Sequence, residues 1–304
     1  MFGDSQEAER LAAVSHNEFQ TMEKAQILKL ADSEYFARHE MSKHSLDDFS
    51  KNPHAYFAKK SAGIKDDSDT PALALGRAVH ASVLERNVYD AEYVAMPETI
   101  KIRRGKEWEA FMAANEGKQI ISRDDVELVE GVSVAVSEHH NARQILDMCN
   151  NREFAVVWDE ATSDNVIVPM RAKIDFANAN YSIIGDLKTT QDASPEAFSK
   201  DADAFGYDIQ AAVYISAIKA CGHKPKLFVF VVVEKAFPYT VSTYTFDVDS
   251  DFVQAGLLEY RKRLKLYSQY ISGEVPVPTG WSEHNLALPA WSKRQKALVD
   301  SISI

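Results

Sequence analysis

The sequence predicts an α/β domain that has a mixed central sheet of about five strands, helices on both sides of the sheet and a largely helical N-terminal part. Three observations carry this prediction. Apolar residues recur at helical spacing through the first half of the chain, and they alternate at a period of two from about Glu153 onward. A further helical pattern then divides the strands into a group of three and a group of two. Chains with this order of elements pack helices and strands in layers.

Capping residues predict two short helices near the N-terminus. Ser45 is a suitable cap for a helix that carries Leu46 and Phe49, and Asn52 with Pro53 begins a second segment. We interpret both segments as structural, because their apolar residues are spaced to cover a core.

A longer helix is predicted over residues 70–90. Leu75, Val79 and Val83 form one apolar stripe along it. His80 lies beside this stripe, and in isolation it would be interpreted as a histidine packed near the core. A functional role for His80 therefore depends on other residues.

The strands are predicted from alternation and from a buried apolar run. Residues 166–177 and 181–189 are separated by the turn-prone segment 178–180, so we expect them to form a hairpin. The other elements of this half are a strand at 155–160, strands at 226–234 and 239–248, and helices at 122–149, 208–221 and 251–273.

Composition limits the classes of function. The two cysteines, Cys149 and Cys221, cannot form a disulfide framework or a four-cysteine metal cluster, so a cytoplasmic protein is expected. The chain starts without an apolar signal segment, and its longest apolar run, 227–233, is too short to cross a bilayer. A membrane role is therefore not expected.

The charge balance bears on binding to nucleic acid. The chain has 34 basic and 45 acidic residues, and its net charge of -11 repels a polyanion at long range. Binding then requires a local basic cluster or metal cations that neutralise carboxylates. One cluster exists, at 101–108, where Arg103, Arg104 and Lys106 are candidate DNA-binding residues. The alternative interpretation is a solvated loop leading into a helix.

An acid and a base lie two residues apart in the stretch IIGDLKTT, residues 183–190. On a strand, Asp186 and Lys188 project from one face while Leu187 projects from the other. Asp175, near the end of the preceding strand, can converge on the same space. Carboxylates from adjacent strands with a lysine are the minimal set for a metal-dependent phosphodiesterase. A surface ion pair is the alternative, but a charge directly after a buried apolar run is unfavourable without a partner.

Two further polar residues lie on the helix predicted at 208–221. Gln210 and Tyr214 are four residues apart and therefore on one face. An amide and a phenol in this arrangement can hydrogen-bond a lysine, a phosphate oxygen or a base. Ordinary amphipathic packing is the alternative interpretation.

Four motifs, taken together and in order, resemble the PD-(D/E)xK nuclease superfamily. The resemblance is closest to the RecE-like (exonuclease VIII) group and to its relatives of the YqaJ and lambda-exonuclease type. It extends from about residue 33 to about residue 290, and the motifs are LGRAVHASVLE, MRAKIDF, IIGDLKTT and GYDIQAAVY. It implies a restriction-endonuclease-like core within a single domain over 1–304, with a helical lead-in at 1–31, a catalytic core at 32–272 and a C-terminal tail at 273–304.

The resemblance also implies a role for each matching residue. His80, Asp175 and Asp186 correspond to metal ligands for Mg²⁺, or alternatively Mn²⁺, and the backbone carbonyl of Leu187 to a further ligand. The family pattern allows aspartate at the position of Asp186. The residues implied to be catalytic are Lys188, which orients the attacking water, and Gln210 and Tyr214, which support the lysine and the scissile phosphate.

The activity implied by the resemblance is that of a Mg²⁺-dependent exodeoxyribonuclease. Such an enzyme degrades linear double-stranded DNA from its 5′ ends and leaves 3′ single strands for a RecT-like annealing protein during recombination, in a bacterial or phage-infected cell. Relatives form homo-oligomeric rings around DNA. Two other classes stay open: an endonuclease of the same superfamily, and a non-catalytic DNA-binding or scaffold protein. The iron–sulphur branch is disfavoured because the chain has two cysteines.

Overall fold

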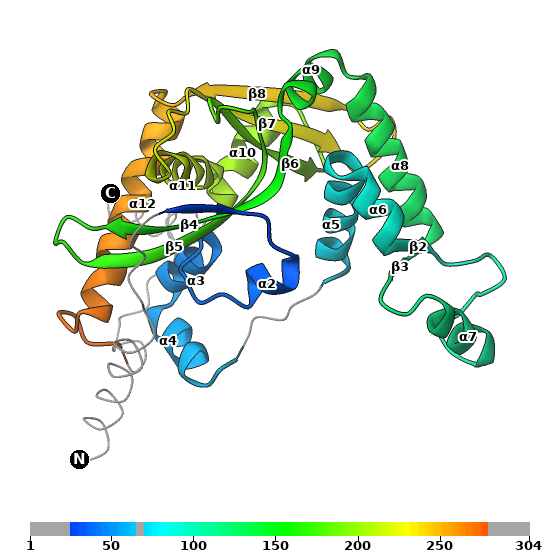
Figure 1. Cartoon of the computed structure of the whole chain (residues 1–304), viewed down its shortest axis with the longest axis horizontal. Coiled ribbons are helices and arrows are strands. Elements are labelled where there is room, and N and C mark those ends of the chain that lie inside the picture. Colours follow the sequence, from blue (N-terminus) through cyan, green and yellow to red (C-terminus); the bar gives the residue numbers. More distant parts are fainter. Residues whose placement is uncertain (1–24, 65–69, 279–304) are drawn as a thin grey trace, which may run out of the picture.

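A computed structural model describes residues 25–64 and 70–278 of the chain. Six strands form the main sheet in the order β1-β4-β5-β6-β7-β8 (Figure 1). The β6–β7 pair is parallel and the other neighbours are antiparallel, which confirms the predicted mixed sheet. The strands are β1 Gln26–Leu28, β4 Asn151–Ala161, β5 Ile167–Ala177, β6 Ile183–Thr190, β7 Leu227–Glu234 and β8 Val241–Asp247.

The helices follow the predicted order. The N-terminal part contains α2 Asp32–Phe36, α3 Lys43–Lys51, α4 Pro53–Ser61, α5 Pro71–Leu84, α6 Arg86–Glu92, α7 Lys106–Ala114, α8 Arg123–Glu138 and α9 His140–Met148, with a two-stranded sheet of β2 Tyr93–Ala95 and β3 Gln119–Ile121. The later helices are α10 Pro195–Phe205, α11 Tyr207–Ala220 and α12 Asp251–Ile271. Among these described elements, none combines the length and apolarity that a bilayer span requires.

Two apolar cores lie on opposite faces of the main sheet. Phe228, Phe230 and Val232 of β7 point into the core that α3, α4, α11 and α12 cover (Figure 1). The alternate residues of β7 point into the core under α5, α8 and α9. Because β7 is buried on both faces, its sequence is continuously apolar rather than alternating.

One part of the expected lead-in is a strand, which corrects the helical prediction there. Residues 1–24 lie outside the described part of the chain, but Gln26–Leu28 form β1 and pair with β4. Ile27 packs against the core that α11 and α12 cover. The backbone groups of β4 need partners along its edge, and this long-range pairing outweighs the local helical preference.

The N-cap of α3 is Ser42, about one helical turn before the predicted Ser45. The α3 helix begins at Lys43, and the Ser42 hydroxyl accepts a hydrogen bond from the backbone N–H of Ser45 at 3.1 Å. Asn52 caps α4 as predicted, since its Oδ1 accepts from the N–H of Ala55 at 3.0 Å. Ser42 and Ser45 are equally suitable caps in sequence, so the choice depends on how the helix packs.

Candidate metal centre

The hairpin of β5 and β6 places two carboxylates in one buried space. The two strands are paired only beside their turn, the last pair being Phe176 with Gly185, and Asp175 and Asp186 follow directly. Asp175 is 6% exposed and Asp186 is 2% exposed. A side chain at position 185 would clash, because a Cβ there would lie 2.3 Å from the Phe176 ring and 2.3 Å from the backbone oxygen of Val229. Glycine thus lets the hairpin close next to the carboxylates.

His80 and Glu153 complete a three-residue cluster with Asp175. The Nδ1 atom of His80 lies 3.4 Å from Oε1 of Glu153 and 3.4 Å from Oδ2 of Asp175. One ligand atom from each of the three residues lies within 4.8 Å of the others. A nitrogen and two carboxylate oxygens at this separation can bind one divalent cation.

Glu153 was not predicted from the sequence, and its backbone is unusual. It lies opposite Asp175, because β4 and β5 are paired on both sides of this position. Its φ angle is 44°, in the left-handed region that is unfavourable for a residue with a side chain. Lys29 stabilises this conformation by donating to the Glu153 carbonyl at 3.2 Å and to the Arg152 carbonyl at 2.8 Å. The only signal in the sequence is an acid at the start of an apolar strand.

The titratable groups of this cluster shift one another's pKa values. Burial would raise the pKa of Glu153, but the adjacent His80 and Lys173 outweigh burial and lower that pKa to about 2. Burial and the Asp186 carboxylate raise the pKa of Asp175 to about 8. Burial would lower the pKa of His80, but the carboxylates of Asp175 and Glu153 raise it to about 9. A divalent cation would relieve the repulsion among these carboxylates.

The donor set fits a metal ion by a second criterion. Oε1 of Glu153 is buried and makes no hydrogen bond of normal geometry with any described residue, although His80 lies nearby. A buried acceptor without a hydrogen-bond donor is unfavourable, and a cation would satisfy it. The other oxygen, Oε2, forms an ion pair with Lys173 at 2.9 Å.

Asp186 and Lys188 form the second half of the site. Nζ of Lys188 lies 2.6 Å from Oδ1 of Asp186 and donates to Oε1 of Gln210 at 2.9 Å. Gln210 donates in turn to Asp186 and, at 3.0 Å, to the hydroxyl of Tyr214. The predicted helix face of Gln210 and Tyr214 therefore meets the strand that carries the lysine. Burial would lower the pKa of Lys188, but Asp186 and Asp175 outweigh burial and raise it above its usual value.

Leu187 connects the two halves through its backbone. Its N–H donates to Oδ2 of Asp175 at 2.8 Å. In a strand, the N–H and C=O of one residue point to the same side, so the Leu187 carbonyl also faces β5 and the carboxylates. Its role as a metal ligand stays a prediction.

Comparison with protein families identifies the chain. The family model described as "PDDEXK-like domain of unknown function (DUF3799)" matches residues 42–284. The chain belongs to this family. No curated protein matches it in sequence.

Two solved structures resemble this PDDEXK-like domain. One, from Eubacterium rectale and provisionally described as an exonuclease, has a TM-score of 0.58 and 15% identity, with 89% of this chain and 98% of that chain covered. The other, a phage-related exonuclease from Haemophilus somnus 129PT, has a TM-score of 0.32 and 14% identity, covering 79% of this chain and 100% of that chain. The first comparison supports the fold.

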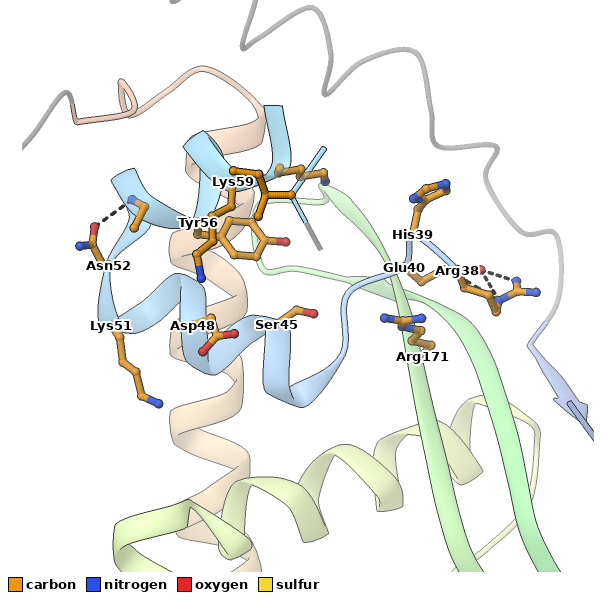
Figure 2. Close-up of a pocket in the computed structure, with 13 residues that line it drawn as sticks. Arg38, His39, Glu40, Ser45, Asp48, Lys51, Asn52, Tyr56, Lys59 and Arg171 are labelled. Atoms are coloured by element: carbon orange, nitrogen blue, oxygen red, sulfur yellow. Dashed lines mark hydrogen bonds and ion pairs between the residues drawn. The ribbon is translucent and has the colours of Figure 1, made fainter. Parts of the chain in front are cut away.

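A groove of about 410 Å³ in the PDDEXK-like domain lies between α3, α4 and Arg171 of β5, and none of the residues of the metal centre lines it. Figure 2 shows Arg38, Lys51 and Arg171 among the residues that line it. Arg171 lies on β5, four residues before Asp175.

The predicted DNA-binding residues lie elsewhere. Lys106 begins α7, which Figure 1 shows on an arm that projects from the body of the PDDEXK-like domain beyond β2 and β3. The Arg103 guanidinium lies 5.8 Å from the centre of the Trp108 ring. Arg103, Arg104 and Lys106 are all exposed, so a DNA-binding role and a solvated loop both remain compatible with their position.

Proposed function

We propose that the protein is a metal-dependent deoxyribonuclease that degrades linear double-stranded DNA. The supporting observation is that an imidazole, three carboxylates and an ammonium group meet in one site, from His80, Glu153, Asp175, Asp186 and Lys188. A protein that only bound DNA would gain nothing from burying these carboxylates together, because their repulsion is unfavourable. The catalytic core would comprise residues 32–272 of a single domain.

His80, Glu153, Asp175 and Asp186 would hold Mg²⁺, or alternatively Mn²⁺, with the Leu187 carbonyl as a further ligand. When bound, the cation supplies a nucleophilic water at neutral pH and offsets charge that develops on the phosphate. Asp175 is held in place by the N–H of Leu187. The backbone of β6 therefore helps to position a carboxylate that β5 carries.

Lys188 would orient the attacking water and contact the scissile phosphate. Its ammonium is held between Asp186 and Gln210, so its position is set before DNA binds. Tyr214 supports Gln210 through the hydrogen bond between them. Burial and the Asp186 carboxylate raise the pKa of Tyr214 well above its usual value, so its hydroxyl stays protonated and can donate a hydrogen bond.

Topology of the substrate separates an exonuclease from an endonuclease. We expect linear duplex DNA to be degraded in Mg²⁺, closed circles to survive, and EDTA to stop the reaction. Nuclease-resistant linkages at the 5′ ends should block the reaction, whereas the same linkages at the 3′ ends should not. Cleavage of closed circles at a rate comparable to that of linear DNA would favour the endonuclease. No cleavage in Mg²⁺ or Mn²⁺ would favour a non-catalytic DNA-binding protein.

The projecting segment that carries Arg103 and Arg104 offers a separate test of DNA binding. Replacing both Arg103 and Arg104 by alanine should weaken binding and lower the salt dependence of affinity by roughly one unit of slope per lost phosphate contact. Lys224→Ala with Lys226→Ala is the matched control, since both lysines are exposed and the loss of charge is equal. Fluorescence anisotropy from low to high salt measures how affinity depends on salt. Equal slopes for the wild type and the arginine variant would mean that the cluster is a solvated loop without a role in DNA binding.

The family resemblance alone suggests the assembly and the partners of the protein. We propose a homo-oligomeric ring around duplex DNA and delivery of the 3′ single strand to an annealing protein. Light scattering of the purified protein measures its mass in solution. A monomeric mass at working concentration would reject the ring.

A further inference from the structure

A phenylalanine is exposed at the junction of α10 and α11, and one aromatic ring, that of Tyr207, connects it to Lys188. Phe205, the last residue of α10, is 58% exposed. Its ring stacks on Tyr207 with centroids 5.8 Å apart and planes at 27°. The Tyr207 ring lies 4.6 Å from Nζ of Lys188. These rings form a continuous aromatic array from the lysine to the solvent.

The corner that presents Phe205 is held in place from several directions. Gly206 has a φ of 62°, a left-handed conformation that glycine adopts without strain, and it joins the two helices. Lys43 of α3 donates to the Phe205 carbonyl at 2.6 Å. Tyr207 also packs against Phe198 and Phe230, with ring centroids 5.6 Å apart in both pairs. The exposed Phe205 ring is therefore attached to a well-packed part of the protein.

Exposure alone would not distinguish Phe205, because single apolar residues are common on protein surfaces. Phe237, in the connection between β7 and β8, is more exposed, at 85%. Phe205 differs from Phe237 in the residues that it contacts. Phe205 contacts the aromatic ring that lies against Lys188, and its carbonyl is bound by the ammonium of Lys43.

We propose that Phe205 forms a nucleobase-stacking subsite for the DNA strand that is cleaved at the metal centre. The inference rests on the proposed function. A nucleotide whose phosphate lies at Lys188 would place its neighbouring base along the Tyr207 ring, on which Phe205 stacks. Aromatic side chains stack on any base, because every base has a π face, and a nearby ammonium favours the backbone phosphates. The subsite would bind any of the four bases, without sequence preference.

Stacking at this position contributes to binding rather than to the chemical step. Phe205→Ala should therefore raise KM for linear duplex by about tenfold and change kcat by less than about twofold. Phe205→Trp, which keeps an aromatic face, should retain the wild-type KM. Phe237→Ala is the matched control and should leave both constants unchanged.

A direct readout uses duplex DNA that carries 2-aminopurine as an unpaired nucleotide at its 5′ end, where the fluorophore is not already quenched inside the duplex, with Ca²⁺ in place of Mg²⁺. Stacking quenches this fluorophore, so the wild-type protein and Phe205→Trp should lower its fluorescence and Phe205→Ala should not. Thermal unfolding of each variant checks that the fold is retained.

Three outcomes would overturn the subsite. The first is a Phe205→Ala variant with wild-type KM and wild-type quenching. The second is a lower kcat at unchanged KM, which would show that Phe205 only supports Tyr207 and Lys188. The third is a wild-type protein that neither binds nor cleaves DNA, which would reject the proposed function as well. The first two leave the proposed function standing.

Discussion

Asp186→Ala is expected to lower the rate of DNA degradation by at least about a thousandfold, the effect of removing a group that stabilises transition-state charge. Asp186 is 2% exposed and lies 2.6 Å from the Lys188 ammonium, so its loss removes a proposed metal ligand and the ion-pair partner of the lysine. Degradation of a linear duplex in Mg²⁺ measures the effect, and thermal unfolding of the same preparations checks the fold.

Two variants make this result easier to interpret. Asp186→Asn keeps the size of the side chain, so it separates the loss of charge from the loss of packing. Asp249→Asn, an exposed carboxylate in the turn before α12, is the control and should keep full activity. Degradation by Asp186→Ala at the wild-type rate would exclude Asp186 from the site.

Glu153→Gln is expected to weaken metal binding by about 10- to 100-fold, as the loss of a group at a metal centre typically does. Glutamine keeps the size of the side chain but not the negative charge that the cation requires. Lys173, 2.9 Å from Oε2 of Glu153, would also lose this ion pair and keep the one with Asp32. Calorimetric titration with Mn²⁺ measures the affinity directly, and the rise in melting temperature on adding metal should shrink in parallel.

The control for this variant is Glu196→Gln, in the exposed first turn of α10. It removes the same charge far from the carboxylate cluster and should leave the Mn²⁺ affinity unchanged. If Glu153→Gln bound Mn²⁺ as tightly as the wild type, the left-handed residue would have a structural role only, and the ligand set would reduce to His80, Asp175 and Asp186.

Local periodicity was sufficient to predict much of the sheet and one half of the site. A period of two requires only neighbouring residues, so it correctly places Leu187 in a core while Asp186 and Lys188 share the other face. The four-residue spacing of Gln210 and Tyr214 likewise gives one helix face. That this face meets Lys188 was implied by the family resemblance and not by the spacing.

Other features depend on contacts that local patterns do not contain. The β1 strand is three residues long, and it exists because the edge of β4 needs backbone partners. The start of α3 depended on packing, since two serines three residues apart were equally good caps. The predicted DNA-binding arginines lie on a projecting arm, away from the groove that adjoins β5.

By itself the sequence determined the α/β order of elements and the side chains that project together within one strand or one helix, because these follow from backbone repeats of two and 3.6 residues. Only the tertiary structure decided that Glu153 faces Asp175, because this depends on the register of two strands and on a left-handed backbone held by Lys29. It also decided that Phe205 stacks on Tyr207, the ring that lies against Lys188, since a glycine corner between two helices places these residues together. Spacing along the chain carries no information on either contact.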